Sequence, residues 1–335
     1  MKNLTPPMRV LTIQSHVIHG VVGNKAAVFP LQLFGLDVDI LNTVQFSTHT
    51  GHGIPPVGSV LAGQEMGAML ESLNERIPWL CDYILTGYCK SAASLTTLAS
   101  YIQGVKQKKP AVIYLMDPVL GDNGRLYVER DVISVYQSQF LPLADIITPN
   151  QYELQWLCDE QSPIVTVEKA ISCINLLHQR YKVPIIILTS LDTTVGDNLI
   201  LVGSKAGSGI FQITFPKVVD FAFTGSGDLF ASLLLGFLHQ LGSSNGGNGE
   251  RHIVSNDDDD DGRFIDRLTL DDIKGVCERA VGVMQRVLER TVEKGRRLFQ
   301  LYGGRESAQE LEKLSFKDSR KYLELDITSL SRDFN

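Results

Sequence analysis

The sequence predicts an α/β fold with a mostly parallel central sheet and helices on both faces. Short apolar runs typical of buried strands recur at 10–14, 39–46, 83–87, 112–116, 145–148 and 185–189. Segments with helical spacing lie between them, at 64–73, 92–105, 132–140 and 167–181. Strand and helix alternating in this way indicate a parallel sheet covered on both sides. Right-handed crossovers then bring the carboxyl ends of the strands to one edge, where such sheets bind ligands.

Composition excludes several classes of function. The chain has 335 residues and a formal net charge of -7, so it lacks the basic surface that a broad nucleic-acid interface needs. The longest apolar stretch, 229–238, is about half a membrane span. The five cysteines are scattered and form no CxxC pair, which argues against disulfides and a structural zinc site. We therefore expect a cytoplasmic protein that binds neither nucleic acid nor membrane.

The chain is expected to form one domain over residues 1–335, with one interruption. The segment 242–261 is rich in Gly, Ser, Asn and Asp and cannot bury enough apolar surface to offset the entropy of ordering. We interpret it as a disordered acidic insertion between two helices, with a cation- or partner-binding tract as the alternative. Helical spacing returns at 270–297, and a charged tail is expected from about residue 303.

Polar residues follow four of the predicted strands. Ser15 follows the first strand, Asp117 the fourth, and Thr148 and Thr189 stand at the ends of the last two. Because the strand ends share one edge of the sheet, these side chains predict one continuous polar crevice. The alternative is that each residue only caps the helix that follows it.

A glycine-rich turn carries the sharpest local signal. The sequence Phe-Thr-Gly-Ser-Gly-Asp at 223–228 runs directly into a segment with helical spacing. The free N–H groups and the positive dipole end of such a helix form an anion site. Asp228 then stands on the first turn, either as a cap or as a base that accepts a proton from a substrate hydroxyl. The turn matches neither the P-loop pattern nor GxGxxG.

A second group of residues offers hard oxygen ligands. Asp117 and Asp122 lie in the sequence DPVLGD, and Glu153 follows about thirty residues later. Mg²⁺ with bound ATP phosphates requires one or two carboxylates, often through water. The structural alternative is that the two aspartates cap turns and that Glu153 lies on a solvated helix face.

Together these motifs resemble one family. The run 10–51, LTGY at 85–88, DPVLGD at 117–122, ADIITPNQYE at 144–153 and TGSGDLFASLLL at 224–235 occur in the order found in pyridoxal kinases, which belong to the ribokinase-like superfamily. The resemblance covers roughly residues 9–240 and continues more weakly through 270–297. The sequence departs from the family in the lid area, 52–63, and in the insertion at 242–261.

The resemblance implies a role for each matching residue. It implies that the vitamer pocket is lined by Ser15, Thr50, Tyr88 and Asp228. It implies that Asp228 is the base and that the anion hole consists of Gly225, Ser226 and Gly227. It implies that these three residues also bind ATP, together with Asn150, Thr189 and Ser190. Finally, it implies a cation network of Asp117, Asp122, Thr148 and Glu153.

The activity implied is ATP-dependent phosphorylation of the 5′-hydroxyl of pyridoxal, pyridoxine and pyridoxamine, with Mg²⁺ and a monovalent cation, K⁺, as cofactors. The resemblance also implies a homodimer, for which the dense apolar stretch at 28–36 is a candidate surface; burial within the monomer is the alternative. Two alternatives for function stay open: another ribokinase-like kinase of a hydroxymethylpyrimidine or a sugar, or an inactive B6-binding protein. Two HxxH pairs, at 16–19 and 49–52, lie in strand-end and loop contexts that do not favour zinc.

Overall fold

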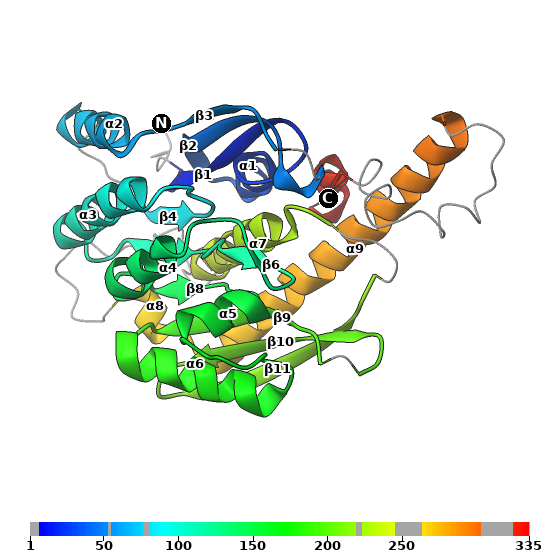
Figure 1. Ribbon diagram of the computed structural model, residues 1–335. Helices are drawn as coiled ribbons and strands as arrows, with labels where there is room; N and C mark the ends of the chain where they lie inside the picture. The colour runs from blue at the N-terminus through cyan, green and yellow to red at the C-terminus, as the bar shows by residue number, and fades with distance from the viewer. Residues whose placement is uncertain are drawn as a thin grey trace, which may run out of the picture.

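The structure, a computed structural model, describes residues 7–52, 55–76, 81–193, 195–218, 223–244, 263–302 and 324–334. Its centre is a nine-stranded sheet in the order β11-β10-β9-β8-β5-β4-β1-β2-β3 (Figure 1). The strands span β1 Arg9–His19, β2 Asp37–Thr48, β3 Gly58–Val60, β4 Tyr83–Thr86, β5 Ile113–Met116, β8 Ile146–Ile147, β9 Ile185–Leu191, β10 Asn198–Lys205 and β11 Gly209–Pro216. A separate hairpin joins β6 Gly121–Asp122 to β7 Arg125–Leu126.

The middle of the sheet is parallel, as predicted. Neighbouring strands from β2 to β9 pair in parallel, whereas β3, β10 and β11 pair antiparallel at the two edges. The register aligns Ile13 with Thr86, Thr86 with Met116, and Met116 with Ile147. The residues that follow this row therefore emerge together at one edge of the sheet.

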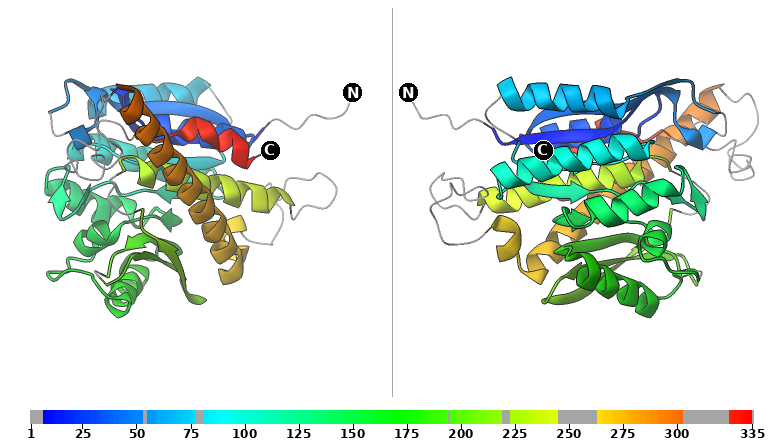
Figure 2. Two further views of the ribbon diagram at one scale, coloured as in Figure 1. Left: turned by 90° about the vertical axis from the view of Figure 1, so that its right-hand side faces the viewer. Right: turned by 60° about the vertical axis from the view of Figure 1, so that its left-hand side comes forward.

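Helices cover both faces, which confirms the predicted class (Figure 2). One face carries α1 Asn24–Leu33, α7 Ser226–Ser244, α8 Phe264–Arg267 and α9 Leu270–Tyr302. The other carries α2 Gly63–Arg76, α3 Ala92–Lys108, α4 Asp131–Val135, a π-helical turn Tyr136–Phe140, α5 Gln151–Leu157 and α6 Val167–Tyr181. Alternate strand residues supply the two cores: Leu115 and Ile146 face α7, whereas Tyr114 and Ile147 face the other layer.

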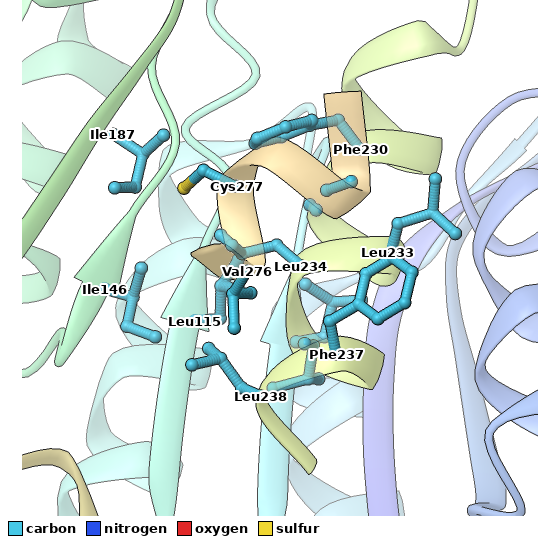
Figure 3. Close-up of a cluster of buried hydrophobic side chains, with 14 of the residues drawn as sticks. Leu115, Ile146, Ile187, Phe230, Leu233, Leu234, Phe237, Leu238, Val276 and Cys277 are labelled. Carbon is cyan, nitrogen blue, oxygen red and sulfur yellow. The ribbon is translucent and has the colours of Figure 1, made fainter. Parts of the chain in front are cut away.

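The middle of helix α7, residues 229–238, is buried on all sides. Its side chains Phe230, Leu234 and Leu238 pack between the sheet and α9 (Figure 3). This burial requires the all-round apolar character of the segment, which the sequence shows. Because the core holds α7, its first turn has a fixed position beside the strand ends.

The apolar stretch at 28–36 is partly buried within the chain: Pro30, Leu31 and Leu36 are buried, whereas Val28, Phe29, Leu33 and Phe34 are half-buried. Its first six residues belong to α1, which packs on α7, β1 and β2. Phe34 makes edge-to-face contacts with Phe237 and with Phe334, at centroid distances of 4.8 and 4.7 Å. Much of the stretch therefore meets its own chain, and whether its half-buried side chains also meet a second subunit stays a prediction.

The structure describes only parts of the last predicted segments. The segment 242–261 was expected to be an insertion, but α7 continues through Ser244, and residues 245–262 lie outside the described residues. A charged tail was expected from about residue 303. Residues 303–323 lie outside the described residues, whereas the 3-10 helix η4 Ile327–Asp333 packs on α1 and α9 and buries Leu330. Asp326 and Asp333 of this segment pair with Lys294, Arg286 and Arg290 of α9, which polarity alone does not indicate.

Candidate active site

A cavity of about 260 Å³ lies at the carboxyl ends of the strands. Every residue singled out from the sequence lines it: Ser15, Thr50, Tyr88, Asp117, Asp122, Thr148, Asn150, Glu153, Thr189, Ser190, Gly225, Ser226, Gly227 and Asp228. These residues come from β1 and β9, from the segments that follow β2, β4, β5 and β8, from the hairpin β6–β7 and from the starts of α5 and α7. The parallel register of the sheet therefore brings the scattered motifs into one crevice.

The glycine-rich turn enters α7 with the geometry that an anion site needs. Helix α7 begins at Ser226, directly after Gly225, whose φ is 84°. A Cβ at Gly225 would lie 2.1 Å from the carbonyl oxygen of Val21, so no other residue fits without movement of the backbone. The first N–H groups of α7 have no partner within the helix and face the cavity end of the sheet.

Asp228 stands on the first turn of α7. Its Oδ2 accepts a hydrogen bond of 2.8 Å from the backbone N–H of Gly23. Burial raises the pKa of Asp228 to about 6, and the Gly23 N–H opposes that rise. A carboxylate with this pKa is ionised at neutral pH and is a stronger base than an ordinary aspartate.

Asp117 and Glu153 are fully buried carboxyl groups beside this turn. Thr148 donates a hydrogen bond of 3.2 Å to Oδ1 of Asp117, and a Cβ at Gly227 would lie 3.6 Å from Oδ2. Burial raises the pKa of Asp117 well above its ordinary value, and the charge of Asp228 raises it further. Burial and the charge of Asp117 likewise raise the pKa of Glu153. No Lys or Arg of the described chain lines the cavity.

Glu153 and Asn150 hold the loop that carries the motif DPVLGD. Oε1 of Glu153 accepts hydrogen bonds from the N–H groups of Leu120 and Gly121, and Oε2 accepts one from Asn150. Asn150 caps α5 through its side-chain oxygen and donates its amide to the carbonyl of Gly121. The capping alternative therefore describes much of what Asn150 does, whereas Glu153 is buried and not on a solvated helix face.

The residues present fit a divalent cation held mainly through phosphates. Within the described part of the chain, no three carboxyl, imidazole or thiol groups form a closed protein cage for a metal. Mg²⁺ needs no such cage, because it keeps several waters and takes one or two carboxylates plus substrate phosphates. Asp117 is buried and has no cationic side chain beside it in the cavity, while Asp122 is held by Asn123 at the rim. Two carboxylates of this kind favour a bound cation.

The sequence reasoning missed the apolar end of the cavity. Val17, Val22, Val44 and Phe46 form a small buried cluster, against which the ring of Tyr88 packs. Val17 belongs to this wall because β1 runs beyond its predicted end at residue 14, whereas Val44 and Phe46 lie within the predicted second strand. The two-residue alternation of Ser15 with Val17, and of Val44 with Phe46, is the signal that could have found them. This end of the cavity suits a flat, largely apolar ring.

A second cavity, of about 490 Å³, adjoins the first. The residues that line both are Asp122, Asn123, Thr189, Ser190, Phe223, Ser226 and Gly227. Beyond them the walls are mainly apolar, with Leu199, Phe215, Phe230, Val281, Met284 and Leu288. The glycine-rich turn thus lies where a ring-sized cavity meets a larger apolar one, and an anion bound at the turn is reachable from both.

Comparison with known proteins assigns the family. A family model described as phosphomethylpyrimidine kinase matches residues 48–245. The pyridoxal kinase of Homo sapiens is 36% identical over 298 residues, which cover 85% of this chain and 86% of that protein. The chain belongs to the pyridoxal kinase family. The pyridoxal kinase of Arabidopsis thaliana is 41% identical over 234 residues, covering 68% of this chain and 74% of that one.

Solved structures of the family share the fold. The pyridoxal kinase of Leishmania donovani, in complex with ADP and pyridoxine, superposes with a TM-score of 0.74 at 29% identity, covering 97% of this chain and 95% of that one. A structure of the Plasmodium falciparum protein with AMP-PNP and PL has a TM-score of 0.71 at 26% identity, covering 98% and 96%. The ribokinase-like fold implied by the motifs is therefore confirmed. In the described part of this chain, no helix has the length and apolarity to cross a membrane.

Proposed function

We propose that this chain transfers the γ-phosphoryl group of ATP to the 5′-hydroxyl of pyridoxal, and also of pyridoxine and pyridoxamine. The product from pyridoxal is pyridoxal 5′-phosphate, made in vitamin B6 salvage. The observation that carries this proposal is the position of Asp228 and its glycine-rich turn at the junction of the two cavities. Family membership and the vitamers named in the structures of relatives support the choice of substrate.

In this proposal each cavity holds one substrate. The vitamer ring lies against Val44, Phe46 and Tyr88, with Ser15 and Thr50 as polar contacts at its edge. The adenosine part of ATP lies in the second cavity, and the phosphates reach Asn150, Thr189 and Ser190. The N–H groups of Gly225, Ser226 and Gly227 bind the oxygens of the transferring phosphoryl group, where charge must be stabilised in the transition state.

Asp228 acts as the general base. The 5′-hydroxyl gives its proton to the carboxylate while its oxygen forms a bond to the γ-phosphorus, and the bond from that phosphorus to the β-γ bridging oxygen breaks. The Gly23 N–H holds the carboxylate by one oxygen and leaves the other for the substrate. The raised pKa of Asp228 favours uptake of the proton.

Asp117, Asp122, Thr148 and Glu153 form the cation site in this proposal. Mg²⁺, when bound, screens the charge of the ATP phosphates, and K⁺ supplies further positive charge beside Asp117 and Thr148. Asp117 and Asp122 offer oxygens to these ions. Glu153 acts mainly by holding the backbone of Leu120 and Gly121, because its own oxygens already accept three N–H groups.

We also propose one kinase domain over the chain, a cytoplasmic location and a homodimer. The half-buried apolar side chains of the stretch 28–36 are one candidate surface for the dimer. Apolar side chains exposed on the β1–β3 edge of the sheet, at Ile18, Ile40, Val57 and Val60, are another. Light scattering at micromolar concentration tests the dimer: a mass near the 37.0 kDa of one chain contradicts it, and twice that mass supports it.

A panel of acceptors tests the function. Purified protein is incubated with ATP, Mg²⁺ and either pyridoxal, pyridoxine, pyridoxamine, hydroxymethylpyrimidine or ribose, and ADP release and the product's phosphate position are measured. We expect turnover on the B6 vitamers with phosphate on the 5′ oxygen, and none in EDTA. The match to a phosphomethylpyrimidine kinase model makes hydroxymethylpyrimidine the second candidate acceptor. Turnover of hydroxymethylpyrimidine alone or of ribose alone contradicts the proposal. Binding of pyridoxal without turnover also contradicts it.

A further inference from the structure

The carboxyl-terminal segment 324–334 is tied to the body of the protein by charges. Asp333 pairs with Arg286 and Arg290 of α9, at 2.5 and 2.6 Å, and Asp326 pairs with Lys294 at 3.1 Å. Leu325 and Leu330 are buried in the core under α1 and α7. These contacts fix the first described residue of the segment, Glu324, beside the site.

The Glu324 carboxylate bridges two loops of the site. Its Oε1 lies 3.0 Å from Nε2 of His49, and its Oε2 accepts a hydrogen bond of 2.9 Å from the N–H of Val21. Gly20 makes this approach feasible, because a Cβ there would lie 2.5 Å from Cδ2 of His49. His49 is buried and lines the vitamer cavity.

The hydrogen-bond directions define the tautomer of His49. The backbone N–H of Gly51 donates to Nδ1 of His49 at 3.1 Å, so Nδ1 carries no proton. The ring proton is then on Nε2 and is donated to Glu324. An imidazole held in this way closes the turn from His49 to Gly51, and Thr50 is the residue between them.

The second arm of Glu324 supports the loop that meets Asp228. Val21 is fixed by its N–H to Glu324, and its carbonyl lies against Gly225 in the glycine-rich turn. Two residues on, the N–H of Gly23 donates to Asp228. One carboxylate therefore fixes both the turn that carries Thr50 and the loop that holds Asp228.

We infer that Glu324 is a positioning residue for phosphoryl transfer, delivered to the site by the docked carboxyl-terminal segment. It touches neither reacting group, and it acts through His49 on the vitamer side and through Val21 on the side of Asp228. The inference rests on the proposed kinase function. It goes beyond that function because it makes the end of the chain part of the machinery for the vitamer.

Glu324→Gln is the sharpest test. Glutamine has the same shape as glutamate but only one oxygen that accepts hydrogen bonds. His49 and the Val21 N–H are both donors, so glutamine can satisfy only one of them. We expect kcat/KM for pyridoxal to fall about ten-fold, through a higher KM for pyridoxal and a lower kcat, as loss of a hydrogen bond to a charged group predicts. The KM for ATP and the Tm should stay close to wild type. Glu293→Gln, which alters an exposed carboxylate paired with Arg297 on α9, is the matched control and should change nothing.

Two further measurements separate this idea from its alternatives. In the wild type the ¹⁵N shifts of the His49 ring should show the proton on Nε2 even if the chain does not phosphorylate pyridoxal, and Glu324→Gln should shift the Nε2 signal because it removes the charge beside that proton. The double variant with His49→Ala should lose less activity than the product of the two single losses. An unchanged kcat/KM, a wild-type His49 ring with its proton on Nδ1, or equal rises in both KM values with a lower Tm would overturn the inference.

Discussion

The backbone N–H of Gly23 donates a hydrogen bond of 2.8 Å to Oδ2 of Asp228, across 205 positions of sequence. This contact joins the loop after β1 to the first turn of α7. It accounts for the orientation of the carboxylate without using the oxygen that a substrate hydroxyl needs. Both loops require glycine near this contact, because a Cβ at Gly23 would meet Ser15 and a Cβ at Gly225 would meet Val21.

The first prediction concerns pH. Because burial raises the pKa of Asp228 to about 6, and because a base must be deprotonated, kcat/KM for pyridoxal should fall as pH drops through about 6. The profile should be measured with pyridoxal and with pyridoxine, because the two vitamers ionise differently. The fall in kcat/KM that Asp228 causes should appear at the same pH with both. Activity that stays level down to pH 5 with both vitamers contradicts the assignment.

The second prediction separates stability from activity at Asp117. A buried carboxyl whose pKa is raised stabilises the fold below the pKa of the unfolded chain, and this contribution is lost as pH rises through the folded pKa. Asp117→Asn removes the charge and keeps an acceptor for Thr148. The Tm without ligands should therefore exceed that of wild type by roughly 2–4 °C at pH 8.

The gain at Asp117 should shrink toward pH 5, while kcat should fall at every pH. Differential scanning calorimetry and a kinase assay on the same preparations check both parts. A variant that is less stable than wild type at pH 8 would show that the carboxylate is already compensated by the protein.

The third prediction tests the packing that fixes α7. A Cβ at Gly236 would lie 2.0 Å from the ring of Phe34, so Gly236→Ala should destabilise the protein by about 1–3 kcal/mol. Gly275→Ala is the matched control on α9, because a Cβ there meets nothing within 4 Å. It should stabilise by about 0.5–1 kcal/mol through helix propensity. Urea unfolding measures both, and equal effects at the two positions would refute the account of the α1–α7 contact.

Local patterns in the sequence predicted several of the strand ends and the helix start that position the site. The strand ends before Asp117 and Thr148 could be predicted, because a buried parallel strand followed by a polar residue has a direct signature. The predicted end at Ser15 is wrong, because β1 continues to His19 past an irregularity in its pairing. The start of α7 could be predicted from glycine followed by helical spacing. The alternation in β10 and β11 also carried a signal, but those strands were not among the predicted ones.

The rest depends on contacts between distant residues. Nothing near Glu324 in the sequence indicates His49, and the predicted charged tail gives no sign of the contacts that dock residues 324–334. Arg286 and Arg290, which pair with Asp333 of this segment, belong to the polar side of the amphipathic helix α9. The apolar stretch around Phe34 indicated a helix with apolar side chains on more than one side. It did not indicate whether the chain itself or a second subunit packs against them, because a core and a subunit interface have similar compositions. Such pairings become visible only in three dimensions.

The most direct test of the central claim is kcat of Asp228→Asn with pyridoxal. Asparagine keeps an oxygen to accept from Gly23, so the turn should stay in place while the base is lost. We predict that kcat falls by about 10²–10⁴-fold, as for other general bases, whereas the Kd for ATP stays within about three-fold of wild type. A variant that retains more than about a tenth of wild-type kcat would show that Asp228 is only a helix cap and would contradict the account.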